Sequence, residues 1–368
     1  MLPASHSDRR KVERHVGIVG IGTYLPPEIR TNAWWPAAIV DGWMAQRRQP
    51  APLPHANPSE GMRRVMAAMA QQAVDPFQGM THRHVLAEDM TSVDMEAEAA
   101  RRALAHAGID RSEVDLGLSH TPVPEFLLSN SSCVLHETLG LRPECMTLQV
   151  DAAGNSFLMQ LTIAEQMIAS GRASCALIVQ SAAGSRLVEV EEPQSPLFGD
   201  GAAAMVLAPT ERPSFLSTVH RTDGKHPRAL IASVRGKRWY DDGRVVLHRG
   251  DLASARQSFL ETADRAVEVI GPALAKAGVS PADIDLFAAH QGTPWLREVT
   301  MEIAGMTRAR HHDSFATTGY LFGASIPFVL QAAHQAQLVE EGQLVLILGG
   351  GVGATIGAIV MRWGRLAR

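Results

Sequence analysis

Two copies of one α/β segment occur in this sequence, and the duplication restricts the fold more than any other feature. The run ALAHAGIDRSEVDLGLSHTP begins at Ala103, and ALAKAGVSPADIDLFAAHQGTP begins at Ala273, 170 residues later. Further on, the run SFLMQLTIAEQMIASGRASCALIVQS from Ser156 corresponds to SIPFVLQAAHQAQLVEEGQLVLILGG from Ser325. Each copy has the pattern helix, strand, loop, long helix, strand. A repeat of this length predicts two similar α/β halves and excludes a solenoid.

The rest of the chain fits a layered α/β protein with one insertion. Short β-branched runs alternate with alanine-rich helical runs, which is typical of helices packed on a mainly parallel sheet. We place the two halves at residues 1–208 and 209–368. Residues about 45–80 match neither copy. They consist of a Pro-rich stretch followed by the methionine-rich run MRRVMAAMAQQAV. They predict a loop and a short helix, whose apolar face either lines a substrate entrance or a partner surface, or packs on the body.

Composition narrows the class of protein further. Hydrophobic residues make up 46% and charged residues 20% of the 368 residues, and the net charge is −4. These values are ordinary for a soluble globular protein and do not favour nucleic acid or an acidic membrane surface. The N-terminus is polar and does not resemble a secretory signal. No apolar run reaches the ~20 residues that a membrane span needs. The three cysteines are scattered, which fits a reducing compartment. We therefore expect a cytoplasmic protein without a membrane segment or nucleic-acid partner.

Two further site classes receive little support. The run GIG at 20–22 lacks the full spacing and the acidic residue of a dinucleotide-binding motif, so we reject a Rossmann dehydrogenase. His311, His312 and Asp313 are adjacent, but a metal site there needs more ligands than the sequence provides. We expect no metal.

Several motifs occur in an order that resembles a known family. They are GIVGIGTYLPPEIRTN, FGDGAAAMVLAP from Phe198, AAHQGTPW, GASIP and the LGGG run. Together they are similar to the ketoacyl-ACP synthase III family over nearly the whole chain except the insertion. The resemblance implies the thiolase fold, with duplicated α/β halves in a layered αβαβα arrangement. It also implies acyl transfer or Claisen-type condensation from a thioester on CoA or an acyl carrier protein, with CoA or phosphopantetheine as substrate carrier and no other cofactor.

The resemblance assigns four positions to the chemistry. Members of the family use a cysteine at a helix N-terminus, a histidine, an asparagine and backbone N–H groups that hold the oxyanion. In this chain the cysteine position in DAAGNSF is Gly154, and the histidine of the HQAN-like loop is His290. The asparagine position falls at Tyr320 in GYLFGASIP, and the backbone donor is Gly351, the last of three glycines. His120, the repeat mate of His290, has no matching motif and is expected to be structural.

The resemblance also implies a carrier-binding end. DGWMAQR is similar to the family's DEWIxxR segment. Trp43 would then stack on an adenine or line the pantetheine mouth, and Arg47 would meet a phosphate. Alternatively, Trp43 packs on the insertion.

No neighbouring residue replaces the missing nucleophile. Ser156 lies roughly 200° around the helix from position 154, and a first-turn serine more simply satisfies a free N–H. Cys133 and Cys145 are expected to be buried small hydrophobes. Gly154 is then either a laboratory replacement made to trap a substrate or a natural divergence, and the two can combine. Tyr320 favours real divergence from decarboxylative condensation.

Two functions from different classes remain. The first is an acyltransferase or condensing enzyme of a specialised pathway such as polyketide or antibiotic biosynthesis. The second is a catalytically silent partner subunit of another ketosynthase. In either case we expect a homodimer, in which the strand CALIVQSA pairs with its mate across a two-fold axis.

Overall fold

Two mixed β-sheets form the centre of the molecule. The computed structural model describes residues 14–47, 57–351 and 355–366. The first sheet has five strands in the order β1-β7-β6-β4-β5, and the second has four in the order β11-β12-β13-β8. The strands of the first sheet are Val16–Tyr24 (β1), Leu116–His120 (β4), Met146–Gln149 (β5), Ala176–Ala183 (β6) and Asp200–Pro209 (β7). Those of the second sheet are Phe215–Thr222 (β8), Leu286–Ala289 (β11), Leu344–Gly351 (β12) and Thr355–Arg362 (β13).

The four strands of the second sheet repeat four of the five strands of the first. In the first, β7 is antiparallel to β1 and β6, and β4 is parallel to β6 and β5. In the second, β13 is antiparallel to β8 and β12, and β11 is parallel to β12. A parallel bridge between Leu286 and Arg310 stands where β5 lies in the first half. The duplication predicted from the sequence is therefore confirmed. The expected boundary at 208/209 falls at the end of β7.

The paired helices end at equivalent glycines. Helix α3 (Ser92–Ala107) and helix α7 (Thr262–Ala277) are 170 residues apart at both ends. Gly108 has φ 66° and Gly278 has φ 69°, and each is the left-handed residue that follows its helix. A residue without a Cβ adopts this conformation at little steric cost, so both helices stop at the same point of the repeat.

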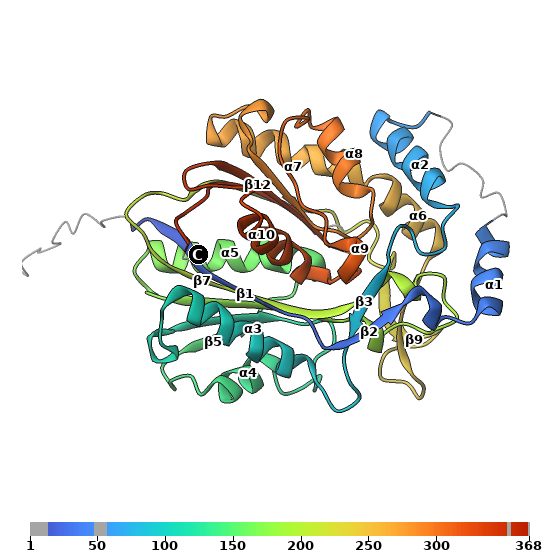
Figure 1. The fold of residues 1–368 in the computed structure, drawn as a ribbon, viewed down its shortest axis with the longest axis horizontal. Helices are drawn as coiled ribbons and strands as arrows, with labels where there is room; N and C mark the ends of the chain where they lie inside the picture. Colours follow the sequence, from blue (N-terminus) through green and yellow to red (C-terminus); the bar gives the residue numbers. More distant parts are fainter. Residues whose placement is uncertain (1–13, 48–56, 352–354, 367–368) are drawn as a thin grey trace, which may run out of the picture.

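Five layers are stacked in the fold (Figure 1). Helices α3 and α4 (Ser131–Leu139) cover the outer face of the first sheet, and α7 and α8 (Leu296–Ile303) cover that of the second. Helices α5 (Ser156–Ala169) and α10 (Ser325–Gln335) lie between the sheets. Their inward side chains, such as Leu158 and Leu330, are fully buried in one apolar cluster that reaches both sheets. The layered αβαβα arrangement is confirmed.

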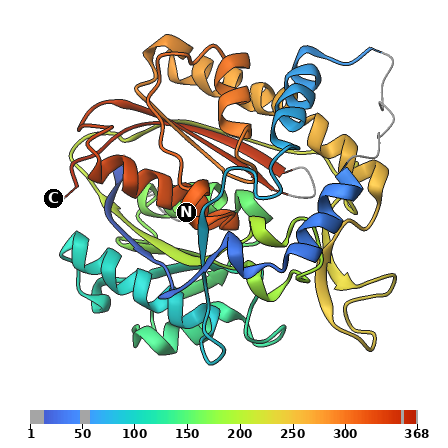
Figure 2. The ribbon, with the colours of Figure 1, turned by 45° about the vertical axis from the view of Figure 1, so that its right-hand side comes forward.

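The insertion forms a helix that packs on the body. Helix α2 (Glu60–Gln72) buries Val65 and Ala68 against Trp295 and Val299. Figures 1 and 2 both show it beside α8 and α6. The simpler of the two interpretations of the methionine-rich run therefore holds. The remaining elements are Glu28–Thr31 (β2), Ala37–Arg47 (α1), His82–Val85 (β3), Ile231–Val234 (β9), Val245–His248 (β10), Leu252–Leu260 (α6) and Phe315–Thr318 (α9).

The strand expected at the dimer axis is in the wrong place for that role. CALIVQSA corresponds to β6, which is hydrogen-bonded to β7 on one side and to β4 on the other. Both of its edges are occupied, so it cannot pair with a second copy. The outer strand on this side of the sheet is β5. The sequence identified a buried strand, but the order of strands depends on long-range pairing that no local pattern encodes.

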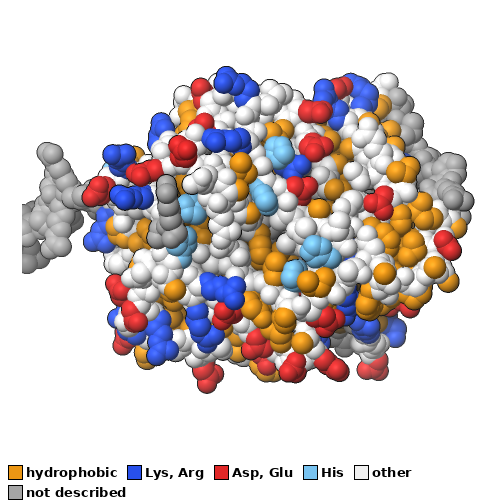
Figure 3. All heavy atoms as spheres, in the orientation of Figure 1, with side chains coloured by type: hydrophobic (Ala, Val, Ile, Leu, Met, Phe, Trp, Pro, Cys, Tyr) orange, Lys and Arg blue, Asp and Glu red, His pale blue; other side chains and the backbone are white. Residues whose placement is uncertain are grey.

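On the face drawn in Figure 3, acidic and basic side chains are interspersed, and neither sign forms a continuous field. Within the described ranges, no helix combines the length and the apolar composition needed to cross a bilayer.

Candidate active site

A strained turn joins β5 to α5 and carries Gly154. Ala153 has φ 48°, a left-handed conformation that is uncommon for a residue with a Cβ. Ser156 holds this turn, because its hydroxyl accepts from the Ala152 N–H at 2.8 Å and donates to the Ala153 carbonyl at 2.7 Å. The side chain is buried and satisfies a free N–H, as expected for Ser156, although this N–H belongs to Ala152 before the helix and not to the first helical turn.

Four of the positions assigned from the sequence converge at this turn. A Cβ placed on Gly154 would lie 2.4 Å from His290 Cε1 and 2.9 Å from His290 Nε2. The rings of His290 and Tyr320 are 5.2 Å apart at 89°. A Cβ on Gly351 would lie 3.0 Å from the Gly154 nitrogen. Residues from both halves of the chain therefore meet within one small volume.

The turn is packed around a residue without a side chain. The same Cβ on Gly154 would lie 2.3 Å from the carbonyl oxygen of Gly350. That oxygen belongs to the backbone of β12, so it cannot rotate away as a flexible side chain would. The His290 side chain occupies the remaining space and is part of a residue that is only 7% exposed. A cysteine at position 154 would need a shift of the backbone or of the imidazole.

Burial keeps both ring side chains of the site neutral. Desolvation lowers the pKa of His290 to about 4. Desolvation also raises the pKa of the Tyr320 phenol above its usual range. The His290 backbone N–H donates to the Leu348 carbonyl at 2.8 Å, which fixes the residue at the end of β11. A neutral imidazole can accept a proton or a hydrogen bond through one ring nitrogen.

Three aromatic rings close the site on the side of Tyr320. Tyr320 lies 4.6 Å from Phe322 and 5.6 Å from Phe198, measured between ring centroids. Phe198 and Phe322 are 5.6 Å apart. These rings occupy the position at which the family pattern has an asparagine. Apolar surface and one phenol therefore replace an amide there.

The carrier-end assignment of Trp43 is wrong in this structure. Trp43 is 1% exposed, and its indole N–H donates to the Glu191 carbonyl at 2.6 Å. Its ring packs against Trp35 and Phe77, each 6.4 Å away. Phe77 comes from the insertion, which therefore covers the indole and leaves no face on which an adenine could stack. The side chain of Arg47 lies outside the described residues.

His120, which was expected to be structural, and Asn155, which was not assigned from the sequence, hold the turn in place. His120 Nε2 lies 3.1 Å from Asp151 Oδ1, and this hydrogen bond is the main cause that lowers the pKa of Asp151 to about 2. Asp151 also accepts from the Ala153 N–H at 2.9 Å. Asn155 donates to the Thr355 hydroxyl at 3.0 Å and thus ties the turn to β13. The repeat offset between His120 and His290 was the feature of the sequence that could have pointed to the pair of His120 and Asp151.

None of the three cysteines replaces the missing nucleophile at the turn. Burial raises the pKa of Cys145 to about 11 and that of Cys175 to about 12. Both are neutral thiols near pH 7. Cys133 lies on α4 and is exposed, which corrects the expectation that it is buried. In the parts of the chain that the structure covers, no group of three His, Cys, Asp or Glu side chains is arranged to hold a metal ion.

Comparisons with known proteins match two segments of this chain to one family. The sequence model of 3-oxoacyl-[acyl-carrier-protein] synthase III matches residues 148–224, and the model of its C-terminal domain matches residues 274–363. Both segments contribute to the site: the first contains Gly154, and the second contains His290, Tyr320 and Gly351.

Solved structures of the same fold cover almost the whole chain. The 3-oxoacyl-(acyl carrier protein) synthase III of Pseudomonas aeruginosa PAO1 is 22% identical, with a TM-score of 0.76 over 96% of this chain and 100% of that chain. The priming β-ketosynthase of the R1128 polyketide pathway is 22% identical, with a TM-score of 0.74 over 96% and 97%. Xanthomonas campestris OleA, solved with lauric acid and lauroyl-CoA, is 20% identical, with a TM-score of 0.74 over 96% and 100%. At these identities the likeness shows the fold, which is the thiolase fold expected from the sequence.

Proposed function

This chain belongs to the 3-oxoacyl-[acyl-carrier-protein] synthase III-like family of acyltransferases and condensing enzymes, and from that premise we propose that it transfers an acyl group directly from a carrier thioester to an acceptor. The carrier is CoA or the phosphopantetheine of an acyl carrier protein. The observation that carries the proposal is the neutral His290 imidazole, whose Nε2 faces the place where family members have their cysteine. The base is retained, and the nucleophile is absent.

The proposed step needs no acyl-enzyme. A hydroxyl or amine of the acceptor attacks the thioester carbonyl, and His290 Nε2 takes the proton that the acceptor loses. The backbone N–H groups of Gly154 and Gly351 stabilise the oxyanion of the tetrahedral intermediate. When the intermediate collapses, the C–S bond breaks, and the imidazolium returns its proton to the departing thiolate. Because burial disfavours the imidazolium, His290 is a weaker base than an exposed histidine, and its imidazolium gives the proton up readily to the thiolate.

Packing supports a natural glycine at position 154. A side chain there would meet the Gly350 carbonyl, and Tyr320 has also replaced the family's asparagine. Two departures from the family pattern favour divergence over a single laboratory replacement. Departure from decarboxylative condensation favours a specialised pathway such as polyketide or antibiotic assembly. The similar priming ketosynthase of a polyketide pathway supports the same assignment.

A specific observation also favours the second candidate, a silent partner subunit. His290 is almost fully buried, and Tyr320, Phe322 and Phe198 close the site beside it. A subunit that only binds a sister synthase or a carrier protein would tolerate such closure, because no substrate has to reach His290.

Acyl transfer and mass measurement separate the two candidates. The chain is incubated with a set of acyl-CoA thioesters and a mixture of small alcohols and amines, and free CoA release is followed with a thiol reagent. Direct transfer predicts acceptor-dependent CoA release, no mass increase of the protein, and loss of release in His290→Ala. Release that persists in His290→Ala contradicts the mechanism, and a stable complex with another synthase without any release supports the silent partner.

We further propose that the chain forms a homodimer through the outer strand β5. Met146 and Leu148 are exposed apolar side chains on this strand. Leu127 and Leu128, at 71% and 95% exposure, precede α4, whose Ser131 donates to Gln149 at the end of β5. An open strand edge beside large exposed apolar side chains is a ready surface for self-association. Pairing of β5 with its copy would continue the first sheet across a two-fold axis.

A further inference from the structure

A short loop closes the active site beside the catalytic imidazole. A Cβ placed on Gly292 would lie 3.3 Å from His290 Nε2 and 3.9 Å from Tyr320 Cε2. In the same loop, at residues 291–294, Thr293 buries a hydroxyl that has no hydrogen-bond partner among the described residues. The closed position of the loop therefore leaves a polar group unsatisfied, which costs free energy. A substrate that approaches Nε2 from this side must displace the loop.

The loop is fixed at its two ends. At its start the buried Gln291 side chain accepts from the Ser314 hydroxyl at 2.7 Å and donates to the His312 carbonyl at 3.1 Å. At its end the buried Trp295 packs in one apolar cluster with Val65 of α2. The first attachment joins the loop to the body of the second half. The second attachment depends on the inserted helix, which lies beside α8 in both views (Figures 1 and 2).

Helix α2 is attached more weakly than the helix beneath it. Three of its 13 residues are buried, whereas α7 buries six of 16. The polar attachments of α2 lie at the surface, where Ser59 Oγ donates to Asp264 at 2.6 Å and Arg64 pairs with Glu302. Exposed pairs of this kind add little stability, and a helix of this length is marginal by itself. We therefore expect α2 to detach at a much lower free energy than global unfolding requires.

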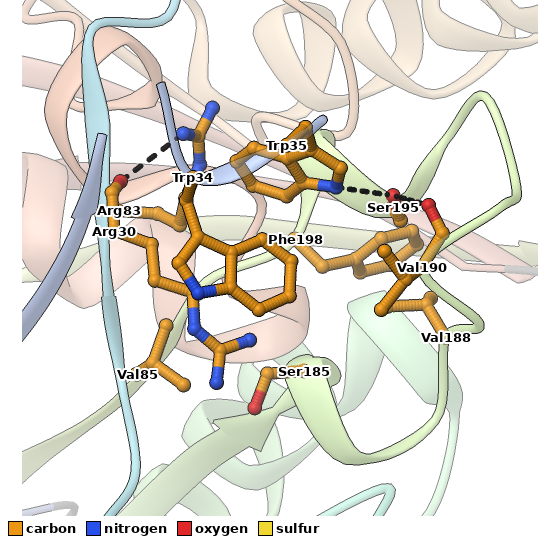
Figure 4. A pocket seen from close by; sticks show the side chains of 10 residues that line it. All are labelled: Arg30, Trp34, Trp35, Arg83, Val85, Ser185, Val188, Val190, Ser195 and Phe198. Atoms are coloured by element: carbon orange, nitrogen blue, oxygen red, sulfur yellow. Dashed lines mark hydrogen bonds between the residues drawn. The ribbon is translucent and has the colours of Figure 1, made fainter. Parts of the chain in front are cut away.

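The chain that follows α2 is anchored, and the anchor determines where the helix can pivot. Phe77 packs on Trp35, with 5.9 Å between the ring centroids. The Trp35 indole N–H in turn donates to the Ser195 hydroxyl at 3.0 Å, the bond drawn in Figure 4. Between α2 and this anchor, Val74 is 77% exposed. Rotation of α2 about residues 73–76 therefore leaves the packing of Phe77 intact.

We propose that α2 is a lid, which holds the loop at residues 291–294 closed through Trp295 and rotates away about residues 73–76 to admit the acyl thioester. The inference rests on the proposed function for its purpose, because only a working His290 needs an entrance. When α2 detaches, Trp295 loses its contact with Val65, and the loop is released at that end. When α2 returns, water is excluded again, so a bound thioester meets the acceptor and not the solvent.

Modification of His290 by diethyl pyrocarbonate, a reagent for neutral imidazoles, measures the opening in the full chain. Peptide mass spectrometry gives the rate at each histidine. The pair Gly61→Cys/Asp264→Cys can tie α2 to α7, because a Cβ on Gly61 lies 2.7 Å from Asp264 Cγ, close to the geometry of a disulfide. The oxidised pair should react at His290 about tenfold or more slowly than the same protein after reduction. His136, on α4 at the other face of the molecule, should react equally in both forms.

Val65→Ala tests the contact with Trp295 without a disulfide. Loss of two methyl groups from this buried contact should raise the rate at His290 about tenfold, because the open state becomes more populated. Met69→Ala is the matched control: it shortens a side chain on the same helix that is 42% exposed, and it should leave the rate unchanged. Thermal unfolding shows whether each variant is folded.

Three results would overturn the lid. They are an equal rate at His290 in the oxidised and reduced pair, a rate in Val65→Ala no higher than in Met69→Ala, and no reaction of His290 in any reduced protein. The measurement does not depend on acyl transfer. Opening without acceptor-dependent CoA release would contradict the proposed function and leave the lid standing. CoA release at the same rate in the oxidised and reduced pair would contradict the lid and leave the proposed function standing.

Discussion

Gly154 and His290 depend on each other in this structure. The glycine lets the imidazole and the Gly350 carbonyl approach to distances that a Cβ would forbid. The imidazole is buried, and its burial lowers its pKa to about 4. The position that lacks a nucleophile is therefore packed directly against the retained base.

Gly154→Ala should destabilise the protein. The added methyl group would overlap a backbone oxygen and the imidazole, and overpacking of this kind reduces the free energy of unfolding by about 1–3 kcal/mol. Chemical denaturation followed by circular dichroism measures the change. Gly42→Ala is the control: it lies in α1 with nothing within 4 Å of an added Cβ. It should be neutral or stabilise by about 0.5–1 kcal/mol, because glycine is a poor residue inside a helix. A Gly154→Ala variant as stable as the natural chain would show that the turn is looser than described.

His290 should make the protein less stable in mild acid. Its pKa is about 4 in the folded chain, against an ordinary value of 6.5. Above pH 6.5 the imidazole is neutral in both states, and its burial carries no penalty from protonation. As the pH falls from 6.5 to 4, the unfolded chain binds a proton that the folded chain does not, so the unfolding free energy falls by up to about 1.4 kcal/mol per pH unit. In His290→Gln this part of the slope should disappear, as measured by urea unfolding between pH 4 and 8. An identical slope in both proteins would place His290 in contact with solvent.

Helix α3 contains a fully buried acid that faces β6. Glu96 Oε1 accepts from the Ser181 hydroxyl at 2.6 Å, and Oε2 has no hydrogen-bond partner among the described residues. Burial raises the pKa of Glu96 to about 8. The side chain is therefore a neutral acid at pH 7, and the contact between this helix and the first sheet depends on its proton.

Glu96 should make the protein less stable as the pH rises. Below pH 4.5 the acid is protonated in both states. Between pH 4.5 and 8 the unfolded chain loses a proton that the folded chain retains, so the unfolding free energy falls by up to about 1.4 kcal/mol per pH unit. The free energy of unfolding of Glu96→Gln should lack this decline, so the difference in stability between this variant and the natural chain should grow up to pH 8. Glu98→Gln changes an exposed acid on the same helix and should leave the profile unaltered. Parallel profiles for Glu96→Gln and the natural chain would mean that the acid is ionised when folded.

At the scale of the whole molecule, assembly should depend on the outer strand β5 of the first sheet. Leu128→Asp places a charge at the most exposed of the apolar side chains beside β5, so it should convert the proposed dimer to a monomer at micromolar concentration. Sedimentation velocity measures the two species. Val74→Asp changes another highly exposed apolar side chain, which follows α2, and should leave the dimer intact. A natural chain that sediments as a monomer contradicts the proposed dimer. A Leu128→Asp variant that remains dimeric contradicts the proposal that the dimer forms through β5 and the apolar side chains beside it.

Local features of the sequence determined the repeat, the helix ends and the turn. The offset between Ala103 and Ala273, the glycines after α3 and α7, and the DAAGNSF turn act over a few neighbouring residues, so they can be read without a structure. These features, with the motif resemblance, were sufficient to predict the five layers and to select positions 154, 290, 320 and 351.

Only the tertiary structure decided which strand is central, how closely Gly154 approaches His290, and that Trp43 is covered. Each of these results depends on residues far apart in the chain: β6 lies between β4 and β7, Gly154 meets Gly350, and Trp43 is enclosed by Glu191 and Phe77. Periodicity and turn chemistry report the conformation of a segment and which of its faces is apolar. They do not report which distant segment packs against that face, because this depends on the shape and volume of all the side chains that fill the core together.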